Sequence, residues 1–393
     1  MAELFALQQP TRFPIPPIRL EVGEPVPEYV WVDAQGSPFS LYTDSHCGRP
    51  TVLIVCRRVA DAMAPVAHFR DLNAAFRDVA AQVLVVTGAP AQENANLTLM
   101  MGLPMPVLSD ASFAIGAAAG LGLDAGCRVL VLSPNMRVEL ALDPAAGGDA
   151  AATVLEHLRA KRAALPPQVV VSHPPVLVLP NVLPPQLCAR IIALFERSNR
   201  YTGGITDGAV SYVVVPTKVR EDAMCADDGP EGQAIFALFR RRVFPEMCKA
   251  FKFRVTRVET MRIGCYDSAN SGRFLPHRDE NVPKMKHRRF GFTINLNAGE
   301  YAGGYLTFPE YGPQLYLPET GSIVVFSASL LHEAMPVTKG KRYGIFGFFF
   351  GEEDEAWRYA TNPAFQSTVV DHPDGTYHVG RGSQPLPDPA SVL

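Results

Sequence analysis

Three side chains that are separated in the sequence have the types and spacing of a metal site. His277 and Asp279 stand two residues apart, and His332 follows far downstream. Side chains two residues apart point to the same side of an extended strand, so this imidazole and this carboxylate can reach one ion together. Two imidazoles and one carboxylate form the ligand set that holds Fe(II) on one face and leaves its other positions open. We therefore predict an iron centre built from these three residues.

An arginine follows the second histidine by ten residues. Arg342 opens a segment that reads as a strand and also carries Phe346 and Phe348. An unpaired guanidinium in such an apolar strand would be costly. Its planar fork is the natural partner of a carboxylate. We therefore predict that Arg342 anchors the carboxylate of a small acid near the metal.

The same stretch contains two further phrases with a recognisable pattern. Residues 300–308 read Glu-Tyr-Ala-Gly-Gly-Tyr-Leu-Thr-Phe, and Tyr266 lies upstream of the His-x-Asp motif. Together with the predicted ligands, these phrases make residues from about 172 to 352 resemble the 2-oxoglutarate/Fe(II)-dependent dioxygenases of the prolyl 4-hydroxylase-like group. That group has a Gly-Gly-x-Leu-x-Phe turn, which the first phrase matches. Many relatives carry lysine where this chain has Arg342, and either cation can hold a carboxylate.

The resemblance implies a hydroxylase that uses Fe(II), 2-oxoglutarate as co-substrate and O2, with ascorbate as an optional reductant. Arg342 would anchor the distal carboxylate of 2-oxoglutarate, and Tyr266 would lie near the same molecule. Relatives that halogenate lack the carboxylate ligand, whereas Asp279 is present here. The expected reaction is hydroxylation of an unactivated C–H bond in an amino-acid, peptidyl (prolyl-like) or related small-molecule substrate, with release of succinate and CO2.

Three more residues near this motif have two interpretations each. Asn295 lies on a strand expected to face the site, where its amide lines the co-substrate pocket or belongs to the core. His287 and Arg288 lie in the basic run of residues 284–289, which directly follows the His-x-Asp motif. Such a run is usually a solvated loop. Its position near the metal also suits a substrate-binding or lid role.

The first half of the chain shows a different pattern. Residues 51–56 and 82–87 are continuous apolar runs typical of strands covered on both faces, and residues 106–110 read Pro-Val-Leu-Ser-Asp. With Arg128 at the start of a hairpin, this order resembles the peroxiredoxin branch of the thioredoxin fold. The peroxidatic cysteine position falls at about Ala64, so we expect a redox-inactive domain. Two alternatives remain: an interaction or dimerisation scaffold, and a thiol peroxidase that uses Cys47 or Cys56.

These patterns predict two domains. The first is an N-terminal α/β thioredoxin-like (peroxiredoxin-like) domain, and the second is a C-terminal double-stranded β-helix (jelly roll) with buttressing helices. A long helix over residues 231–251 is among these helices, with Pro245 expected to kink it or end it early. The expected boundaries are an extended lead-in (1–27), the thioredoxin-like domain (28–164), a Pro-rich linker (165–180), the dioxygenase domain (181–352) and a C-terminal tail (353–393).

Composition limits the possible partners and compartment. The chain has 393 residues, 47% of them hydrophobic and 19% charged, with a net charge of −3. Such a balance is typical of a globular protein and gives no support for a nucleic-acid partner. No apolar run reaches the ~20 residues of a membrane span. The seven cysteines form no Cys-x-x-Cys pair, which favours reduced thiols in the cytoplasm. We expect a small-molecule or peptide substrate and a homodimer formed through the N-terminal domain.

Overall fold

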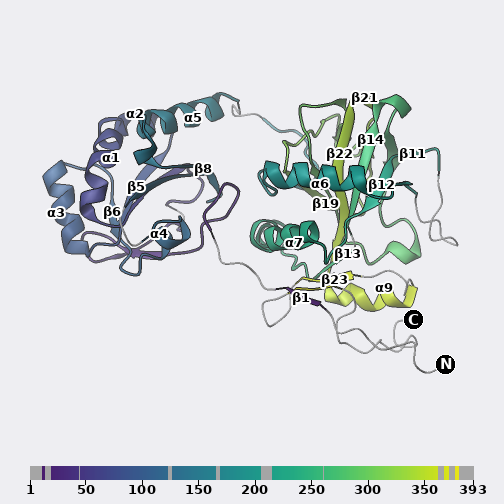
Figure 1. Ribbon diagram of the computed structural model, residues 1–393, viewed down its shortest axis with the longest axis horizontal. Helices are drawn as coiled ribbons and strands as arrows, with labels where there is room; N and C mark the ends of the chain where they lie inside the picture. Colours follow the sequence, from purple (N-terminus) through teal and green to yellow (C-terminus); the bar gives the residue numbers. More distant parts are fainter. Residues whose placement is uncertain are drawn as a thin grey trace. The chain divides into compact units, whose positions relative to one another are not determined.

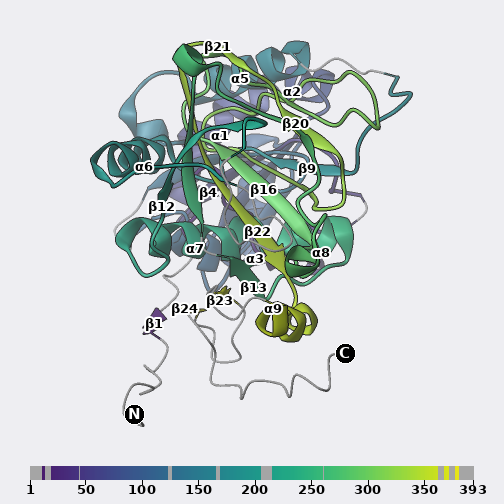
Figure 2. The same cartoon turned by 90° about the vertical axis from the view of Figure 1, so that its right-hand side faces the viewer.

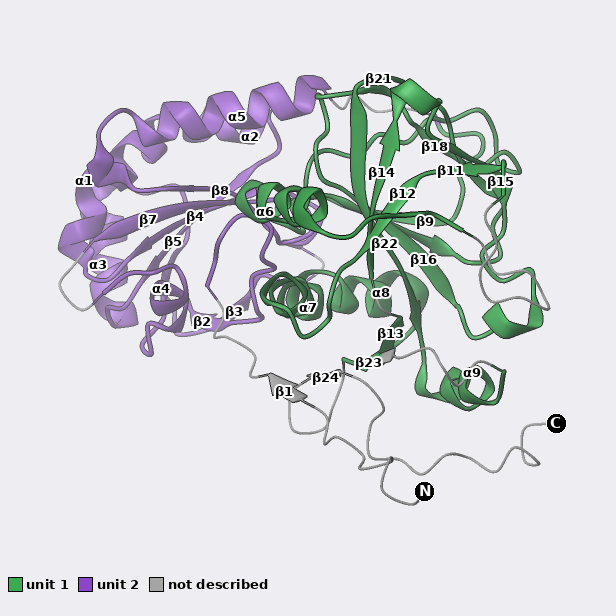
Figure 3. Cartoon of the chain, turned by 45° about the vertical axis from the view of Figure 1, so that its right-hand side comes forward, with its two compact units in different colours: residues 1–16, 170–393 green, residues 17–169 purple. Residues whose placement is uncertain are grey.

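The chain divides into two compact units in the computed structural model (Figure 3). The N-terminal unit is Pro17–Val169, and the C-terminal unit combines Met1–Pro16 with Val170–Leu393. The structure describes residues 11–13, 19–43, 45–122, 126–164, 169–204, 215–259, 261–361, 367–370 and 377–379. Among these residues, no helix is long and apolar enough to cross a membrane.

The N-terminal unit is built on a mixed seven-stranded sheet with the order β3-β2-β6-β5-β4-β7-β8. Its strands are β2 (Val30–Val32), β3 (Pro38–Ser40), β4 (Thr51–Cys56), β5 (Gln82–Thr87), β6 (Val107–Ser109), β7 (Cys127–Leu132) and β8 (Val138–Leu142). Its helices are α1 (Val59–Asp71), α2 (Asn73–Asp78), α3 (Ala91–Met101), α4 (Ala114–Ala118) and α5 (Ala150–Ala164). Strands β4, β5 and β6 run parallel, and β7 runs antiparallel to β4.

Strand β4 confirms the expectation of a strand covered on both faces. Val52 and Ile54 belong to one hydrophobic cluster, and Leu53 and Val55 belong to a second one. The bounds of β4 and β5 agree with the predicted ones. Helix α5 begins after Asp149, whose side chain accepts a hydrogen bond from the backbone N–H of Ala152 at 3.1 Å. Helix α3 and the hairpin of β2 and β3 were not predicted from the sequence.

The residues near the expected peroxidatic position do not form a reactive thiol. Ala64 lies inside helix α1, and Cys56 is fully buried at the end of β4. The Sγ of Cys56 lies 2.8 Å from the Sγ of Cys127 on the neighbouring strand. This contact, together with burial, raises the pKa of Cys56. A protonated, buried thiol is a poor nucleophile.

The C-terminal unit contains a large sheet and a smaller one. The central strands of the large sheet are β16 (Phe290–Asn295) and β22 (Lys341–Phe350), which pair antiparallel and cross the middle of Figure 2. Around them lie β9 (Val176–Leu179), β10 (Tyr201–Thr202), β12 (Glu221–Met224), β13 (Arg257–Glu259), β14 (Arg262–Asp267) and β19 (Ile323–Ser327). The smaller sheet has the order β11 (Lys218–Val219), β15 (Arg273–His277), β20 (His332–Ala334) and β18 (Leu306–Thr307). A two-stranded sheet pairs β17 (Ala302–Gly303) with β21 (Val337–Lys339).

Helices cover one face of the large sheet. They are α6 (Pro185–Arg197), α7 (Pro230–Arg242) and α8 (Phe244–Phe251), and Figure 1 shows α6 and α7 lying across the strands. Ile191 of α6 and Phe239 of α7 pack in one core with Ile345 of β22. Because strand side chains alternate between faces, Arg342 and Phe346 of β22 point to the opposite face.

One helix of this unit is interrupted as predicted, and one predicted strand is divided. The helix expected over residues 231–251 ends early near Pro245, which lies in the first turn of the next helix, α8. The strand expected over residues 255–265 is divided into β13 and β14. Both pair with β22, but their other neighbours differ, since β13 pairs with β23 (Ser367–Val369) and β14 pairs with β12.

The predicted lead-in, linker and tail also contain regular structure. Strand β9 lies inside the predicted linker. It pairs antiparallel with β19 and so extends the large sheet. The predicted tail contains helix α9 (Glu355–Thr361), β23 and β24 (Tyr377–Val379), and β24 pairs with β1 (Thr11–Phe13) of the predicted lead-in. Val370 is buried in the core of the unit. These segments therefore belong to the C-terminal unit.

We predict that Cys56 supplies no thiol peroxidase activity to the full-length protein, because its buried thiol stays protonated. The measurement is peroxide consumption with dithiothreitol or thioredoxin as reductant. Stoichiometric peroxide reduction that is lost in Cys56→Ser would contradict this prediction.

Candidate active site

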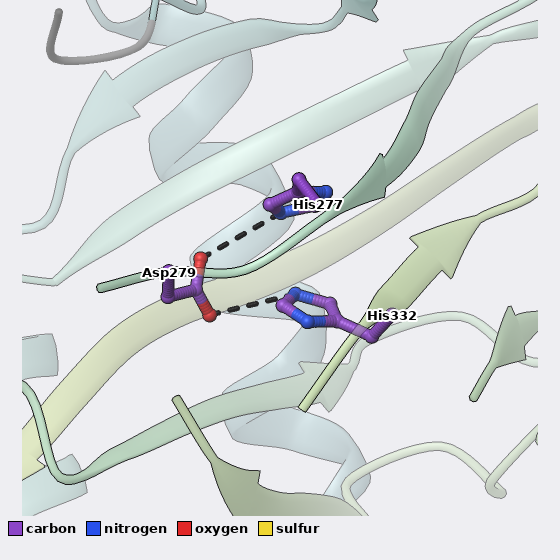
Figure 4. Close-up of side chains that lie close together, drawn as sticks. All are labelled: His277, Asp279 and His332. Atoms are coloured by element: carbon purple, nitrogen blue, oxygen red, sulfur yellow. Dashed lines mark ion pairs between the residues drawn. The ribbon is translucent and has the colours of Figure 1, made fainter. Parts of the chain in front are cut away.

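The three predicted metal ligands lie together, as Figure 4 shows. His277 ends β15 and His332 begins β20, and these two residues are direct partners in the antiparallel register. Asp279 follows β15, and its backbone N–H donates a hydrogen bond to the carbonyl of Ala328 at 3.0 Å. The pairing of two short strands thus unites residues that are far apart in the sequence.

The distances between the ligand atoms are suitable for one shared ion. Asp279 Oδ1 lies 3.6 Å from His277 Nε2, and Asp279 Oδ2 lies 3.4 Å from His332 Nε2 (Figure 4). One ligand atom from each residue lies within 4.8 Å of the others. The remaining ring nitrogens face backbone carbonyls, with His277 Nδ1 at 2.8 Å from Leu275 O and His332 Nδ1 at 2.9 Å from Leu330 O. A proton on Nδ1 that is donated to these carbonyls leaves each Nε2 lone pair free for a metal.

The charge states of these groups at neutral pH also suit a metal. Burial acts to raise the pKa of Asp279, but the neighbouring imidazoles lower it to about 2, so the carboxylate is ionised. Burial lowers the pKa of His332, which favours the neutral imidazole. Two neutral imidazoles and an ionised carboxylate are the donor set that suits Fe(II). Among the described residues, this is the one group of three or more such side chains that could hold an ion.

A glycine on β16 of the large sheet leaves room for the Asp279 carboxylate, which follows a strand of the smaller sheet. A Cβ atom at Gly291 of β16 would lie 2.8 Å from Asp279 Oδ2 and 3.0 Å from the ring of Phe326. Both distances are too short for an ordinary contact, so a side chain here would displace the carboxylate or the ring. Sequence reasoning did not find this residue, since the requirement comes from a strand that is adjacent only in the folded chain.

The three residues line a cavity of about 480 Å³. Its volume is in the usual range of ligand-binding pockets. Apolar side chains form much of its wall, including Phe274, Leu275, Phe326, Phe346 and Phe348. Arg342 and Tyr266 also line it, as partners in the register of β14 and β22. The cavity therefore unites the predicted metal ligands with the predicted anion anchor.

Arg342 has the properties of a binding residue that lacks its ligand. Its side chain is 3% exposed, and neither Nε nor Nη1 has a hydrogen-bond partner among the described residues. A buried, unpaired guanidinium is strongly unfavourable, whereas a carboxylate can accept both hydrogen bonds. The Tyr301 hydroxyl is close by: burial raises its pKa, and Arg342 and Asn295 act to lower it. Tyr301 was missed by sequence reasoning, although it lies in the predicted Gly-Gly turn.

Tyr266 and Asn295 differ in their relation to the cavity. The hydroxyl of Tyr266 accepts a hydrogen bond from Arg220 Nη1 at 3.3 Å, and the Arg342 guanidinium carbon lies 5.5 Å from the Tyr266 ring centre. Asn295 is 1% exposed and donates a hydrogen bond from Nδ2 to Pro318 O at 2.7 Å. It is not one of the cavity-lining residues described, and it contacts the site through Tyr301.

His287 and Arg288 are held in place by a buried carboxylate, unlike a solvated loop or a lid, and Arg288 also lines the cavity. His287 is 2% exposed and pairs through Nε2 with the buried carboxylate of Glu259. Arg288 forks onto the same carboxylate, with contacts of 3.0 Å from Nε and 2.9 Å from Nη2. Its guanidinium stacks 3.7 Å from the centre of the Phe348 ring, and its Nη1 donates to the Asp279 carbonyl at 3.3 Å. The buried carboxylate of Glu259 holds both residues in place, and Arg288 in turn supports the backbone of Asp279.

About half of the chain is similar to known proteins in sequence. No family model matches the chain. A PKHD-type hydroxylase from Stutzerimonas stutzeri (strain A1501) is 26% identical over 225 residues, which are 52% of this chain and 96% of the relative. The chain has PKHD-type hydroxylases as homologues over about half its length. The predicted resemblance to the prolyl 4-hydroxylase-like group is thereby confirmed.

Two solved structures are also similar to parts of the chain. A prolyl hydroxylase from Trichoplax adhaerens, in complex with a hypoxia inducible factor peptide fragment, has a TM-score of 0.39 and 18% identity, and the match covers 46% of this chain and 86% of that one. A peroxidoxin from Mycobacterium tuberculosis has a TM-score of 0.33 and 24% identity, and the match covers 36% of this chain and 98% of that one.

We predict that Gly291→Ala weakens metal binding, because the new Cβ would meet Asp279 Oδ2 at 2.8 Å. The measurement is the dissociation constant of Fe(II) under anaerobic conditions, with circular dichroism as a check on folding. The matched control is Gly122→Ala, where nothing lies within 4 Å of the added Cβ. Equal metal affinity in Gly291→Ala and in wild type would show that the carboxylate does not need this space.

Proposed function

We propose that this homologue of the PKHD-type hydroxylases is an Fe(II)- and 2-oxoglutarate-dependent dioxygenase that hydroxylates an unactivated C–H bond. One observation supports the proposal above the others. A single cavity contains the three predicted metal ligands and a buried guanidinium whose Nε and Nη1 have no hydrogen-bond partner among the described residues. A metal site alone would not need Arg342, and an anion site alone would not need the triad.

In this proposal, each side chain has a defined task. His277, Asp279 and His332 hold Fe(II), and the Nδ1 hydrogen bonds of the two histidines fix the direction of the Nε2 lone pairs. Arg342 binds the distal carboxylate of 2-oxoglutarate and so orients its keto-acid end toward the metal. When bound, Fe(II) supplies the oxidising chemistry that couples hydroxylation to the conversion of 2-oxoglutarate and O2 into succinate and CO2.

The remaining wall of the cavity would hold the substrate and exclude water. Phe274 and Phe326 lie against the ligand histidines, with ring-centre distances of 3.4 Å from Phe274 to His277 and 4.5 Å from Phe326 to His332. A closed, apolar surround protects a reactive centre from side reactions. An amino acid, a prolyl-like residue of a peptide or a related small molecule would fit a cavity of this volume.

The arrangement of the sheets and helices supports a jelly-roll architecture for the C-terminal unit. Strands of the large sheet and of the smaller sheet line one cavity from different sides, and helices cover the opposite face of the large sheet. That arrangement suits a jelly roll with buttressing helices. Cytoplasmic location, dimerisation through the N-terminal unit and the use of ascorbate stay predictions from the sequence.

We predict that His332→Ala loses both equimolar Fe(II) binding and substrate-dependent succinate formation, because it removes one of three protein ligands. The control is His68→Ala, a histidine with 60% side-chain exposure in the N-terminal unit. Metal content and succinate release are measured on the same preparations. Turnover of His332→Ala near the wild-type rate would refute the metal assignment.

We predict that Arg342→Ala raises the KM for 2-oxoglutarate by more than about a hundredfold, since truncating one partner of a buried ion pair costs ~3–5 kcal/mol. Arg342→Lys keeps the charge and loses the fork, so its KM should lie between the two. Iron affinity should be unchanged in both variants. A KM for Arg342→Ala within about threefold of wild type, a loss under ~1 kcal/mol, would mean that another residue anchors the co-substrate.

A further inference from the structure

A second group of charged side chains lines the same cavity. It consists of Lys218 on β11, Arg220, Asp222 on β12 and Arg262 on β14, which we call the basic cluster. The side chains of Lys218 and Asp222 are 6% and 2% exposed. Three cations stand here against one carboxylate, and none of the four belongs to the proposed iron or 2-oxoglutarate site.

Within the basic cluster, Arg220 and Asp222 form a two-point ion pair with each other. Arg220 donates from Nε to Asp222 Oδ1 at 2.5 Å and from Nη2 to Asp222 Oδ2 at 2.9 Å, and its Nη1 reaches Tyr266. The opposing strand leaves space for this pair, because a Cβ at Gly264 would lie 2.8 Å from Arg220 Nε and 2.9 Å from Asp222 Oδ1. The fork therefore occupies both carboxylate oxygens.

The other two cations lack an equivalent partner. Lys218 Nζ donates to the Gly204 carbonyl at 2.9 Å and stands 3.6 Å from Asp222 Oδ2, which Arg220 already holds. Arg262 makes no hydrogen bond or ion pair with any residue that the structure describes, and it acts on Lys218 and Asp222 through its charge. Lys218 and Arg262 therefore both line the cavity with donor capacity beyond the contacts described here.

The electrostatic environment of Lys218 is unfavourable without such an anion. Burial, followed by repulsion from Arg220 and Arg262, lowers the pKa of Lys218 to about 7, against the opposing effect of Asp222. An added negative charge would relieve the repulsion and restore the ammonium. A buried amine that binds no anion would be more stable as an apolar side chain.

The position of Arg262 separates it from the proposed 2-oxoglutarate anchor. In the register of β14 and β22, Tyr266 pairs with Arg342 and Arg262 pairs with Phe346. Four residues along a strand correspond to roughly 13 Å at ~3.3 Å per residue. Arg342 and Arg262 therefore enter the cavity from different positions along the sheet. This separation supports assigning the basic cluster to an anion other than the distal carboxylate of 2-oxoglutarate.

We propose that Lys218 and Arg262 bind an anionic group of the primary substrate, a carboxylate or a phosphate, while the apolar wall holds its carbon skeleton. This inference rests on the proposed function and makes the substrate an acid. The ring of Phe274, whose centre lies 5.2 Å from Lys218 Nζ and 3.4 Å from that of His277, joins the anion site to the metal ligands. A substrate fixed by its anion at the basic cluster would extend along this ring and present a carbon atom to the iron.

The test measures anion binding directly and without turnover. The full-length chain is loaded with Zn(II), which has no redox chemistry, and saturated with 2-oxoglutarate. Glutarate and inorganic phosphate are then titrated separately by calorimetry. Wild type should bind at least one of them. Lys218→Met and Arg262→Gln should each weaken that binding by about tenfold or more, as expected for losing a charged hydrogen bond of ~1.5–3 kcal/mol. The affinity for 2-oxoglutarate should not change.

A matched control is Lys286→Met, which makes the same substitution at a side chain that is 51% exposed. It should leave anion binding unchanged. Preference for glutarate would identify a carboxylate, and preference for phosphate would identify a phosphorylated substrate. Absence of binding by both anions, or wild-type affinity in both cluster variants, would overturn the inference. So would a selective loss of 2-oxoglutarate affinity, which would make the cluster a co-substrate site.

The proposed function and this inference can be refuted by different results. Metal-loaded wild type that does not bind 2-oxoglutarate would refute the dioxygenase assignment, and the anion titrations are then made without the co-substrate. Binding that still depends on Lys218 and Arg262 would keep the anion site and remove only its link to hydroxylation.

Discussion

The site depends on one electrostatic constraint: an ionised carboxylate is held in a buried cavity between two imidazoles. Asp279 is ionised although burial opposes its charge, because His277 and His332 stand beside it. That balance depends on the positions of the two imidazoles beside the carboxylate. The pairing of β15 with β20 fixes the place, and the Leu275 and Leu330 carbonyls fix the ring nitrogen that carries the proton.

A second layer of residues holds the carboxylate in position. Glu259 is buried beneath Arg288 and His287, and Arg288 in turn reaches the carbonyl of Asp279. Burial acts to raise the pKa of Glu259, but its two basic partners hold it well below its usual range. Buried ion pairs contribute little net stability compared with apolar packing. Their value here is geometric, since a metal site needs its ligands fixed by supporting hydrogen bonds.

The sequence was sufficient to predict that His277, Asp279, His332 and Arg342 lie together in one site, and the structure places all four around one cavity. His277 and Asp279 are expected on the same side of a strand because side chains alternate with a period of two residues. Arg342 was predicted as a binding residue because it is a charged residue in an otherwise apolar strand. The same local rules gave strands β4 and β5, whose apolar runs are covered on both faces. Apart from His332, which lies far downstream and is joined to His277 by strand pairing, these features depend on residues that are close in the sequence.

The errors concern residues whose partners are distant in the sequence. His287 and Arg288 read as a solvated basic run because Glu259 precedes them by 28 and 29 residues. Gly291 of the large sheet acquires its role only through Asp279, which follows a strand of the smaller sheet, and Lys218 and Arg262 acquire theirs only when β11 and β14 line one cavity. The structured parts of the predicted tail are stabilised in the same way, by pairing of β23 with β13.

The most direct test of the account is whether 2-oxoglutarate binding requires iron. Equilibrium dialysis under anaerobic conditions would compare the affinity of the full-length chain for 2-oxoglutarate before and after loading with Fe(II). The account predicts that iron binds in equimolar amount and that tight co-substrate binding appears only with it, because Arg342 holds one end of the molecule and the metal holds the other. Equal affinity with and without iron would contradict the account.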